Sequence, residues 1–309
     1  MNNTILTLKH INKKYGTKRI LNDLNMNVCH KDIYGFVGEN GSGKTTTLKL
    51  ITGLTSCDSG EINIRNPKDK KLQGSLHHIG FLIDHPVMYP TMTAYQNLKT
   101  ICLQKGVPCT DINETLDLVG LDPLSKKTTR NFSLGMKQRL GLAFTLVGNP
   151  DLIILDEPTN GLDPVGIIEF RKLIHQINTE KEVTFIISSH MLSELSQLGT
   201  TFGFLSNGSL IKELKKEDLL KEMKTNLYIR ATTPLSLSEI INFLKEQKFT
   251  KIEQPSELEL VIYPDSNDID HLYHLINTTF KNNIVSMQPQ LETLENFYIR
   301  NMNRNKVRR

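Results

Sequence analysis

Eight consecutive residues form a segment whose residue types suit the binding of phosphate groups. They match the pattern G-x-x-x-x-G-K-[ST] throughout and read Gly38, Glu39, Asn40, Gly41, Ser42, Gly43, Lys44 and Thr45. Glycines let the backbone wrap closely around phosphate oxygens, and successive N–H groups then form an anion-binding nest. Lys44 would neutralise the β- and γ-phosphates, and the Thr45 hydroxyl would coordinate Mg²⁺. We therefore predict that this phosphate loop (residues 38–45), with Thr46 after it, binds the phosphates of a nucleotide together with Mg²⁺.

Two adjacent carboxylates could complete such a site. The apolar run 152–155 favours a buried strand, and Asp156 and Glu157 follow it directly. Ligands of open parallel sheets bind at the carboxyl ends of strands. Asp156 is predicted to hold Mg²⁺ through its water shell, and Glu157 to polarise the attacking water. The alternative, a helix cap at Asp156 with a surface Glu157, is weak beside a complete phosphate loop.

A histidine follows a third apolar run. His190 comes three residues after the predicted strand 183–187, so it too lies beyond the carboxyl end of a strand. A γ-phosphate contact is feasible there, but a single histidine is as often structural or exposed. Its spacing alone leaves both interpretations open.

The elements around these residues indicate a parallel α/β sheet. Apolar runs at 33–37, 152–155 and 183–187 alternate with helical patterns, as in sheets covered on both faces. Helical patterns at 93–102, 113–119 and 133–147 suggest an insertion between strands. The charged stretch 212–218 is predicted to begin a helix and to mark a domain boundary. Beyond it, strand patterns at 227–231, 257–263 and 284–287 and helical patterns at 235–246, 269–280 and 291–302 suggest a small α+β domain.

Composition excludes several other classes of protein. The 309 residues carry a net charge of +4, without the concentrated basic patch of a dedicated nucleic-acid binder, and no nucleic-acid partner is expected. None of the four cysteines lies in a C-x-x-C pair, so we expect reduced thiols rather than a metal site. The apolar runs are far shorter than the roughly 20 residues of a membrane-spanning helix. Any role at a membrane would therefore need a partner that spans it.

A further segment resembles a family signature. Residues 133–137 read Ser-Leu-Gly-Met-Lys and are similar to the L-S-G-G-Q segment of ABC transporter nucleotide-binding subunits. This resemblance implies a P-loop ABC ATPase core in residues 1–218, with a helical subdomain at about 88–148 and an accessory domain at 219–309. It also implies that Ser133 and Gly135 contact ATP held by a second copy, so that the chain works as a homodimer. An ordinary N-cap at Ser133 is compatible with that role.

Other matches follow in the family's order. Tyr15 is placed like the aromatic residue that stacks on adenine, and residues 160–163 are similar to the segment after the catalytic glutamate. His190 is similar to the switch histidine, which the family assigns to catalysis together with Glu157 and Lys44. The resemblance covers about residues 4–210.

One departure from the family pattern points to a subgroup. Many members have Gln where this chain has Asp84, a shorter and charged residue, although a carboxylate is a competent partner for Mg²⁺. The alternative is an Asp that opens a turn before Pro86. Three features are similar to those of the transporters that confer bacitracin resistance or lantibiotic immunity: the acidic residue at position 84, the run 86–90 and the segment 291–297. The resemblance then implies export of a peptide antibiotic.

The same resemblance implies a membrane partner. A multi-span permease would place a short helix in a cleft near residues 84–97, and the chain would sit on the cytoplasmic face of the membrane. A transporter subunit for another substrate remains an alternative. Soluble ABC ATPases of DNA repair carry long coiled coils that are not indicated here, and ribosome-protection proteins carry two nucleotide domains. A nucleotide kinase would lack the segment at Ser133.

Overall fold

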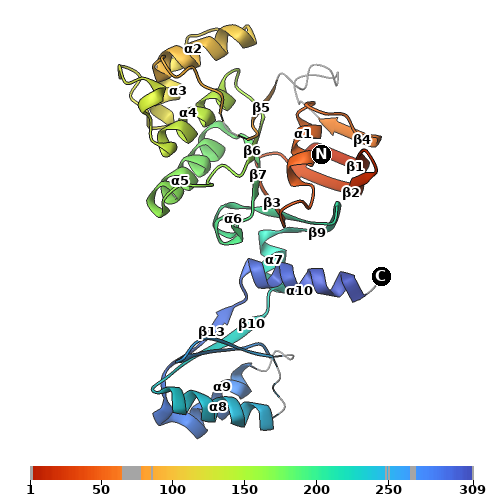
Figure 1. Ribbon diagram of the computed structural model, residues 1–309, viewed down its shortest axis with the longest axis vertical. Helices are drawn as coiled ribbons and strands as arrows, with labels where there is room; N and C mark the ends of the chain where they lie inside the picture. The colour runs from red at the N-terminus through yellow and green to blue at the C-terminus, as the bar shows by residue number, and fades with distance from the viewer. Residues whose placement is uncertain are drawn as a thin grey trace. The chain divides into compact units, whose positions relative to one another are not determined.

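The computed structural model describes residues 3–64, 78–84, 86–247, 249, 251–264 and 269–307 (Figure 1). The chain forms two compact units. The first unit comprises Met1–Lys216 together with Arg304–Arg309, and the second comprises Glu217–Asn303. Among the helices in the described ranges, none combines the length and the apolar character needed to cross a membrane.

A six-stranded sheet forms the centre of the first unit. Its order is β5-β6-β7-β3-β8-β9, parallel except for β9. The strands are β3 (Ile33–Gly38), β5 (Ile79–Leu82), β6 (Leu152–Asp156), β7 (Thr184–Ser189), β8 (Thr201–Ser206) and β9 (Ser209–Lys215). Every residue of β3, β6 and β7 is buried, as expected for strands covered on both faces. The predicted α/β class and these three strands are confirmed.

The prediction that a helix begins at residue 212 is wrong. Residues up to Lys215 belong to β9, and the helix α7 (Lys216–Glu222) begins only after it. Glu213 explains why: its carboxylate accepts hydrogen bonds from the Tyr34 hydroxyl at 2.8 Å and from the Asn27 N–H at 3.1 Å. Burial raises the pKa of Glu213. Burial, together with the nearby Glu213 carboxylate, raises the pKa of Tyr34 well above its usual value. Pairing with β8 and this contact override the helix propensity of Lys and Glu.

A second sheet, which the sequence did not predict, covers the helix that follows the phosphate loop. It is antiparallel, with the order β2-β1-β4: β1 (Thr4–Tyr15), β2 (Lys18–Cys29) and β4 (Ser59–Ile64). Apolar side chains of β1 and β2, such as Leu8 and Leu24, form one core cluster with Leu48 of α1 (Lys44–Ile51) and with β3 and β6. The phosphate loop is thus fixed between two packed layers.

Helices between β5 and β7 complete the first unit. They are α2 (Ala94–Lys105), α3 (Ile112–Leu118), η2 (Thr129–Asn131), α4 (Leu134–Leu146) and α5 (Pro164–Lys181), with α6 (Leu192–Leu198) after β7. The three predicted helices of this region are confirmed within a few residues. α4 packs closely on β5: a Cβ at Gly80 would overlap the Thr145 carbonyl oxygen, and one at Gly141 would lie 3.0 Å from Leu82 Cδ2.

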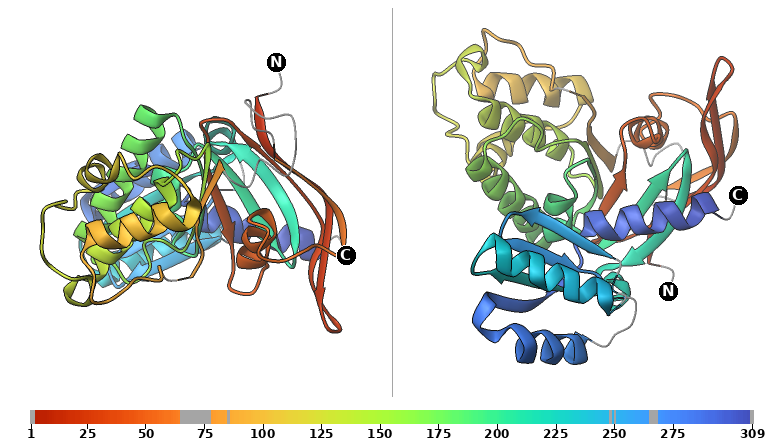
Figure 2. Two further views of the ribbon diagram at one scale, coloured as in Figure 1. Left: turned by 90° about the horizontal axis from the view of Figure 1, so that it is seen from above. Right: turned by 60° about the horizontal axis from the view of Figure 1, so that its bottom comes forward.

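The second unit has the order strand–helix–strand–strand–helix–strand, the split β-α-β arrangement. Its elements are β10 (Thr225–Ala231), α8 (Pro234–Glu246), β11 (Ile252–Ser256), β12 (Glu259–Ile262), α9 (Ile269–Phe280), η3 (Lys281–Asn283) and β13 (Ile284–Leu291), followed by α10 (Leu294–Val307). The sheet order is β11-β12-β10-β13. α8 and α9 cover one face (Figure 2), where Ile240 and Ile276 pack on Leu227 and Ile229.

A buried ion pair ties the ends of this unit together. Arg300 of α10 donates two hydrogen bonds to the Glu292 carboxylate, at 3.0 and 2.6 Å, and a third to the Glu222 carbonyl oxygen at 3.1 Å. The Lys224 N–H also donates to Glu292, at 3.1 Å. The side chain of Glu292 is only 4% exposed, so these hydrogen bonds replace the water that a buried carboxylate has lost.

Arg300→Met is expected to destabilise the second unit by about 3 kcal/mol, because removal of one partner leaves a buried charge unpaired. Hydrogen exchange at the β10 amides of the full chain measures this, with a loss of protection of roughly a hundredfold. Arg230→Met, the same change at an exposed position of β10, is the matched control. Equal, small losses in the two variants would contradict the stabilising role of Arg300.

Candidate functional site

The phosphate loop joins β3 to α1 and has the backbone that its glycines permit. Gly41 and Gly43 have φ of 79° and 112°, a region that side chains disfavour. A Cβ at Gly38 would lie 2.6 Å from Ser42 Oγ, and one at Gly43 would lie 2.7 Å from Leu21 Cδ2. Glycine is therefore required at these positions by conformation or by packing.

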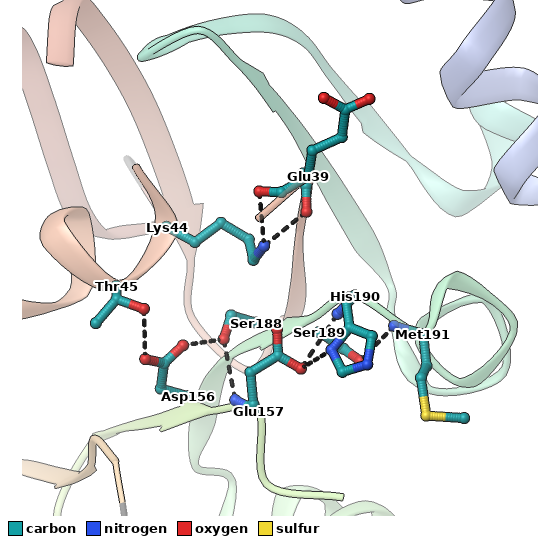
Figure 3. Close-up of polar contacts among 10 residues, drawn as sticks. Glu39, Lys44, Thr45, Asp156, Glu157, Ser188, Ser189, His190 and Met191 are labelled. Atoms are coloured by element: carbon teal, nitrogen blue, oxygen red, sulfur yellow. Dashed lines mark hydrogen bonds and ion pairs between the residues drawn. The ribbon is translucent and has the colours of Figure 1, made fainter. Parts of the chain in front are cut away.

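Lys44 begins α1, and its side chain lies over the loop. Its Nζ donates to the carbonyl oxygens of Gly38 at 2.6 Å and Glu39 at 3.2 Å (Figure 3). Burial lowers the pKa of Lys44, while the carboxylates of Glu157 and Asp156 oppose that shift. The ammonium group is thus partly desolvated and faces two acids, a position suited to a polyphosphate.

Thr45 and Asp156 meet across the sheet edge. The Thr45 hydroxyl donates to Asp156 Oδ2 at 2.7 Å, and the Ser188 hydroxyl donates to Asp156 Oδ1 (Figure 3). β6 and β7 are in parallel register with Asp156 opposite Ser188, which brings the two side chains together. Hard oxygen donors thus converge at the carboxyl ends of the strands, as Mg²⁺ prefers.

Glu157 and His190 form the neighbouring contact. Glu157 has a φ of 49°, and its backbone N–H donates to the carbonyl and hydroxyl oxygens of Ser188 on β7, both at 3.1 Å. Its Oε2 lies 2.6 Å from His190 Nδ1 and accepts the His190 N–H at 3.2 Å. The two residues lie at the carboxyl ends of β6 and β7, and the Glu157 carboxylate contacts the histidine there.

Asp84 lies at the end of the adjacent strand, where its partner is a lysine. The Asp84 carboxylate is 3.4 Å from Lys49 Nζ on α1, and Asp84 has a φ of 65°. The backbone bends at Asp84, and its carboxylate is 71% exposed.

Ser133 and Gly135 lie apart from this cluster. Ser133 caps α4, and its Oγ accepts the Met136 N–H at 3.2 Å. Gly135 is next to Leu162, and both line a cavity of about 740 Å³. In Figure 1, α4 and α1 lie on opposite sides of β6 and β7. The predicted signature segment is thus beside residues 160–163, away from the phosphate loop of its own chain.

Tyr15 ends β1 in the hairpin that flanks the phosphate loop. Tyr15 is 51% exposed, and Lys13 Nζ lies 5.3 Å from its ring centre. Tyr15 pairs with Lys18 at the start of β2, whose Leu21 contacts the loop at Gly43. An exposed aromatic face near the loop is suited to stacking on a base.

The residues of the cluster fit a magnesium-bound nucleotide. Ser42 Oγ is buried and has no hydrogen-bond partner among the described residues, although it sits inside the loop. Thr45 and Asp156 offer oxygen ligands, and the N-terminal end of α1 favours an anion. The arrangement therefore offers an anion-binding loop beside oxygen ligands that suit Mg²⁺.

Ser188 was not singled out by sequence reasoning. It joins Asp156 to the Glu157 backbone, and its signal is its place at the end of the strand opposite Asp156. A parallel register argument could have found it.

Comparisons with known proteins agree with this geometry. A family model described as ABC transporter matches residues 21–160, and one described as AAA domain, putative AbiEii toxin, Type IV TA system, matches residues 126–196. The uncharacterized ABC transporter ATP-binding protein YcbN of Bacillus subtilis (strain 168) is 35% identical, over 98% of each chain. The bacitracin transport ATP-binding protein BcrA of Bacillus licheniformis is 44% identical, over 72% of this chain and 74% of BcrA.

One further relative and two solved structures are also similar to the chain. The lantibiotic transport ATP-binding protein SrtF of Streptococcus pyogenes is 41% identical, over 72% of this chain and 96% of SrtF. The structure of cbiO1 from Clostridium perfringens, part of the ABC transporter complex cbiONQ, has a TM-score of 0.64 at 26% identity and covers 80% of this chain and 96% of cbiO1. The dimeric ATP-binding cassette MJ0796, bound to ADP and Pi, has a TM-score of 0.59 at 26% identity, over 68% and 98%. The predicted ABC ATPase fold is confirmed.

Proposed function

The chain belongs to the family of ABC transporter ATP-binding proteins, and from that premise we propose that it powers export of a peptide antibiotic through a separate membrane permease. It is an ATP-hydrolysing transporter subunit, as the family is. BcrA and SrtF, named for bacitracin and lantibiotic transport, support bacitracin, a lantibiotic or a similar peptide as the substrate. Resistance or immunity of the cell would follow.

The observation that carries the proposed chemistry is the contact chain from Thr45 through Asp156 and Ser188 to Glu157. Thr45 and Asp156 would hold Mg²⁺. The Asp84 carboxylate, which follows the neighbouring strand β5, would supply a third oxygen ligand. The bound ion would supply charge neutralisation at the phosphate oxygens. Glu157 would accept the proton of the attacking water, and His190, already bonded to it, would orient its carboxylate.

The loop residues would bind the phosphates before this step. Backbone N–H groups of residues 38–46 would form the nest, and Lys44 would exchange its two carbonyl partners for phosphate oxygens. Tyr15 would stack on the adenine. These roles need only side chains that already lie at the carboxyl edge of the sheet or in the adjoining hairpin.

A second copy of the chain would complete each site. Ser133 and Gly135 lie away from their own phosphate loop, which supports a head-to-tail homodimer in which each signature segment covers the partner's ATP. MJ0796 is a dimeric cassette of similar fold. Residues 1–218 would form the nucleotide-binding domain and residues 219–309 an accessory domain.

The permease would hold the chain at the cytoplasmic face of the membrane. Exposed apolar side chains after β5, among them Val87 and Tyr89, support the cleft near residues 84–97 as its docking place. The test is to tag the chain in its native host, solubilise the membranes gently and identify what co-purifies. A multi-span protein is expected, and ribosomes or DNA-repair proteins without it would overturn transport.

Val87→Glu is expected to lower recovery of that permease by about tenfold, because a charge would be buried at an apolar contact. Quantitative mass spectrometry of the tagged complex measures the ratio of permease to chain. Leu235→Glu, the same kind of change at an exposed leucine of α8, is the matched control. Equal recovery with both variants would exclude residues 84–97 as the docking place.

A further inference from the structure

Asp84 reaches the same edge of the sheet as the catalytic carboxylate Glu157. β5 and β6 are in parallel register, with Leu82 opposite Leu155. Asp84 and Glu157 each follow their paired residue by two positions. Ligands bind at the carboxyl ends of such strands. Asp84 follows β5 at this edge, where Thr45 and Asp156 would hold the metal ion.

Lys49 lies on the same face of α1 as the metal-side hydroxyl. It follows Thr45 by four residues, and residues at that spacing are neighbours on a helix surface. Thr45 bonds to Asp156, while Lys49 Nζ lies 3.4 Å from Asp84 Oδ2. The Asp84 carboxylate is therefore held about one helical turn from the hydroxyl that would bind Mg²⁺.

The ion pair can be exchanged for another partner. The side chains of Lys49 and Asp84 are 36% and 71% exposed, so their attraction is weak. The neighbouring Ile83 packs against the core, whereas the Asp84 side chain is exposed and can reorient. A glutamine in place of Asp84 would be neutral and would not form an ion pair with Lys49. The ion pair therefore requires an acidic residue at this position.

We propose that Lys49 is a positioning residue that holds Asp84 outside the metal position, and that magnesium-bound ATP competes with Lys49 for the Asp84 carboxylate. This role rests on the ATP and Mg²⁺ site of the proposed function. The lysine keeps an additional negative charge away from Asp156 and Glu157 until the cation arrives to neutralise it. Asp84 thus becomes available in step with the nucleotide.

Equilibrium binding of mant-ATP, with Mg²⁺ and with EDTA, tests the competition. The measured quantity is the gain in affinity that Mg²⁺ provides. Lys49→Met is expected to raise this gain about two- to fivefold, since an exposed ion pair no longer has to be broken. Lys49→Arg, which keeps the charge, should restore the original gain, and Lys172→Met on α5 is the matched control for net charge.

Asp84→Asn supplies the decisive comparison. It should lower the gain from Mg²⁺ and remove any effect of Lys49→Met when the two are combined. An equal effect of Lys49→Met with and without Asp84→Asn would overturn the role of Lys49 and leave ATP binding intact. Failure of the unsubstituted chain to bind mant-ATP would instead overturn the proposed site, and the role of Lys49 with it.

A second measurement observes the nucleotide-free protein and uses the magnesium–ATP complex only as a reference. The chain contains no tryptophan, so Val87→Trp, at an 89% exposed position three residues after Asp84, adds a single reporter. In the nucleotide-free protein, Lys49→Met should shift its emission toward that of the magnesium–ATP complex. An unchanged spectrum would contradict the holding of Asp84 by Lys49.

Discussion

Glu157→Gln is expected to lower the rate of ATP hydrolysis by about 10²- to 10⁴-fold while ATP binding is retained. The amide keeps the size of the side chain and its contact to His190, but it cannot accept the proton of the attacking water. The rate of phosphate release at saturating ATP measures the loss, and mant-ATP titration checks binding. Glu157 Oε2 lies 2.6 Å from His190 Nδ1, so the substitution changes the group that would take the proton while it keeps the shape of this contact.

Glu114→Gln is the matched control for that experiment. It makes the same change at a carboxylate of α3 that is 75% exposed and paired with Lys181. We expect it to hydrolyse ATP at the original rate. A near-normal rate for Glu157→Gln would remove Glu157 from the role of base, and a loss of ATP binding would show that the substitution disturbs the loop instead.

Mixing two inactive variants is expected to restore hydrolysis. Lys44→Ala damages the phosphate loop and Ser133→Arg the signature segment, so each homodimer has two damaged sites. In a mixed dimer both lesions fall in one site and the other is intact. Random pairing makes half of the dimers mixed, so about a quarter of the original rate should return.

A second mixture controls for this recovery. Lys44→Ala and Glu157→Gln both damage the side of the ATP site that contains the phosphate loop of the same chain. Each site of their mixed dimer therefore carries one lesion, and no site is intact. The absence of recovery there, beside recovery in the first mixture, would place Ser133 opposite the partner's loop. Recovery in neither would contradict the placement of Ser133 at an independently active site of the partner. Gly135→Asp in place of Ser133→Arg checks that a lost helix cap is not the reason.

The loop and its carboxylates could be predicted because the determinants are local. Eight adjacent residues fix the phosphate loop, and the buried runs before Gly38 and Asp156 fix the strands that carry them. The order of strands then brings the carboxyl ends together without further information. Residue type and position along one strand were sufficient for Lys44, Thr45, Asp156 and Glu157.

Contacts between distant segments could not be predicted in the same way. The pair of Lys49 and Asp84 depends on how α1 lies beside β5, and β1, β2 and β4 depend on pairings over long strands with several register shifts. The strand at Glu213 forms because a buried tyrosine hydroxyl requires an acceptor. A local pattern does not report such partners, since each is chosen by the packing of the whole unit.

The absence of a side chain at Gly80 brings β5 into contact with the α4 backbone at Thr145, and Gly141 of α4 packs closely against the Leu82 side chain of β5. β5 leads to Asp84, and α4 begins at Ser133, so a displacement at one end is carried to the other. In the proposed dimer these residues serve two different ATP molecules. Occupancy of one site would then raise affinity at the other, and hydrolysis should depend on ATP concentration along a sigmoidal curve with a Hill coefficient above one. The two glycines would thereby set the cooperativity of the pair of sites.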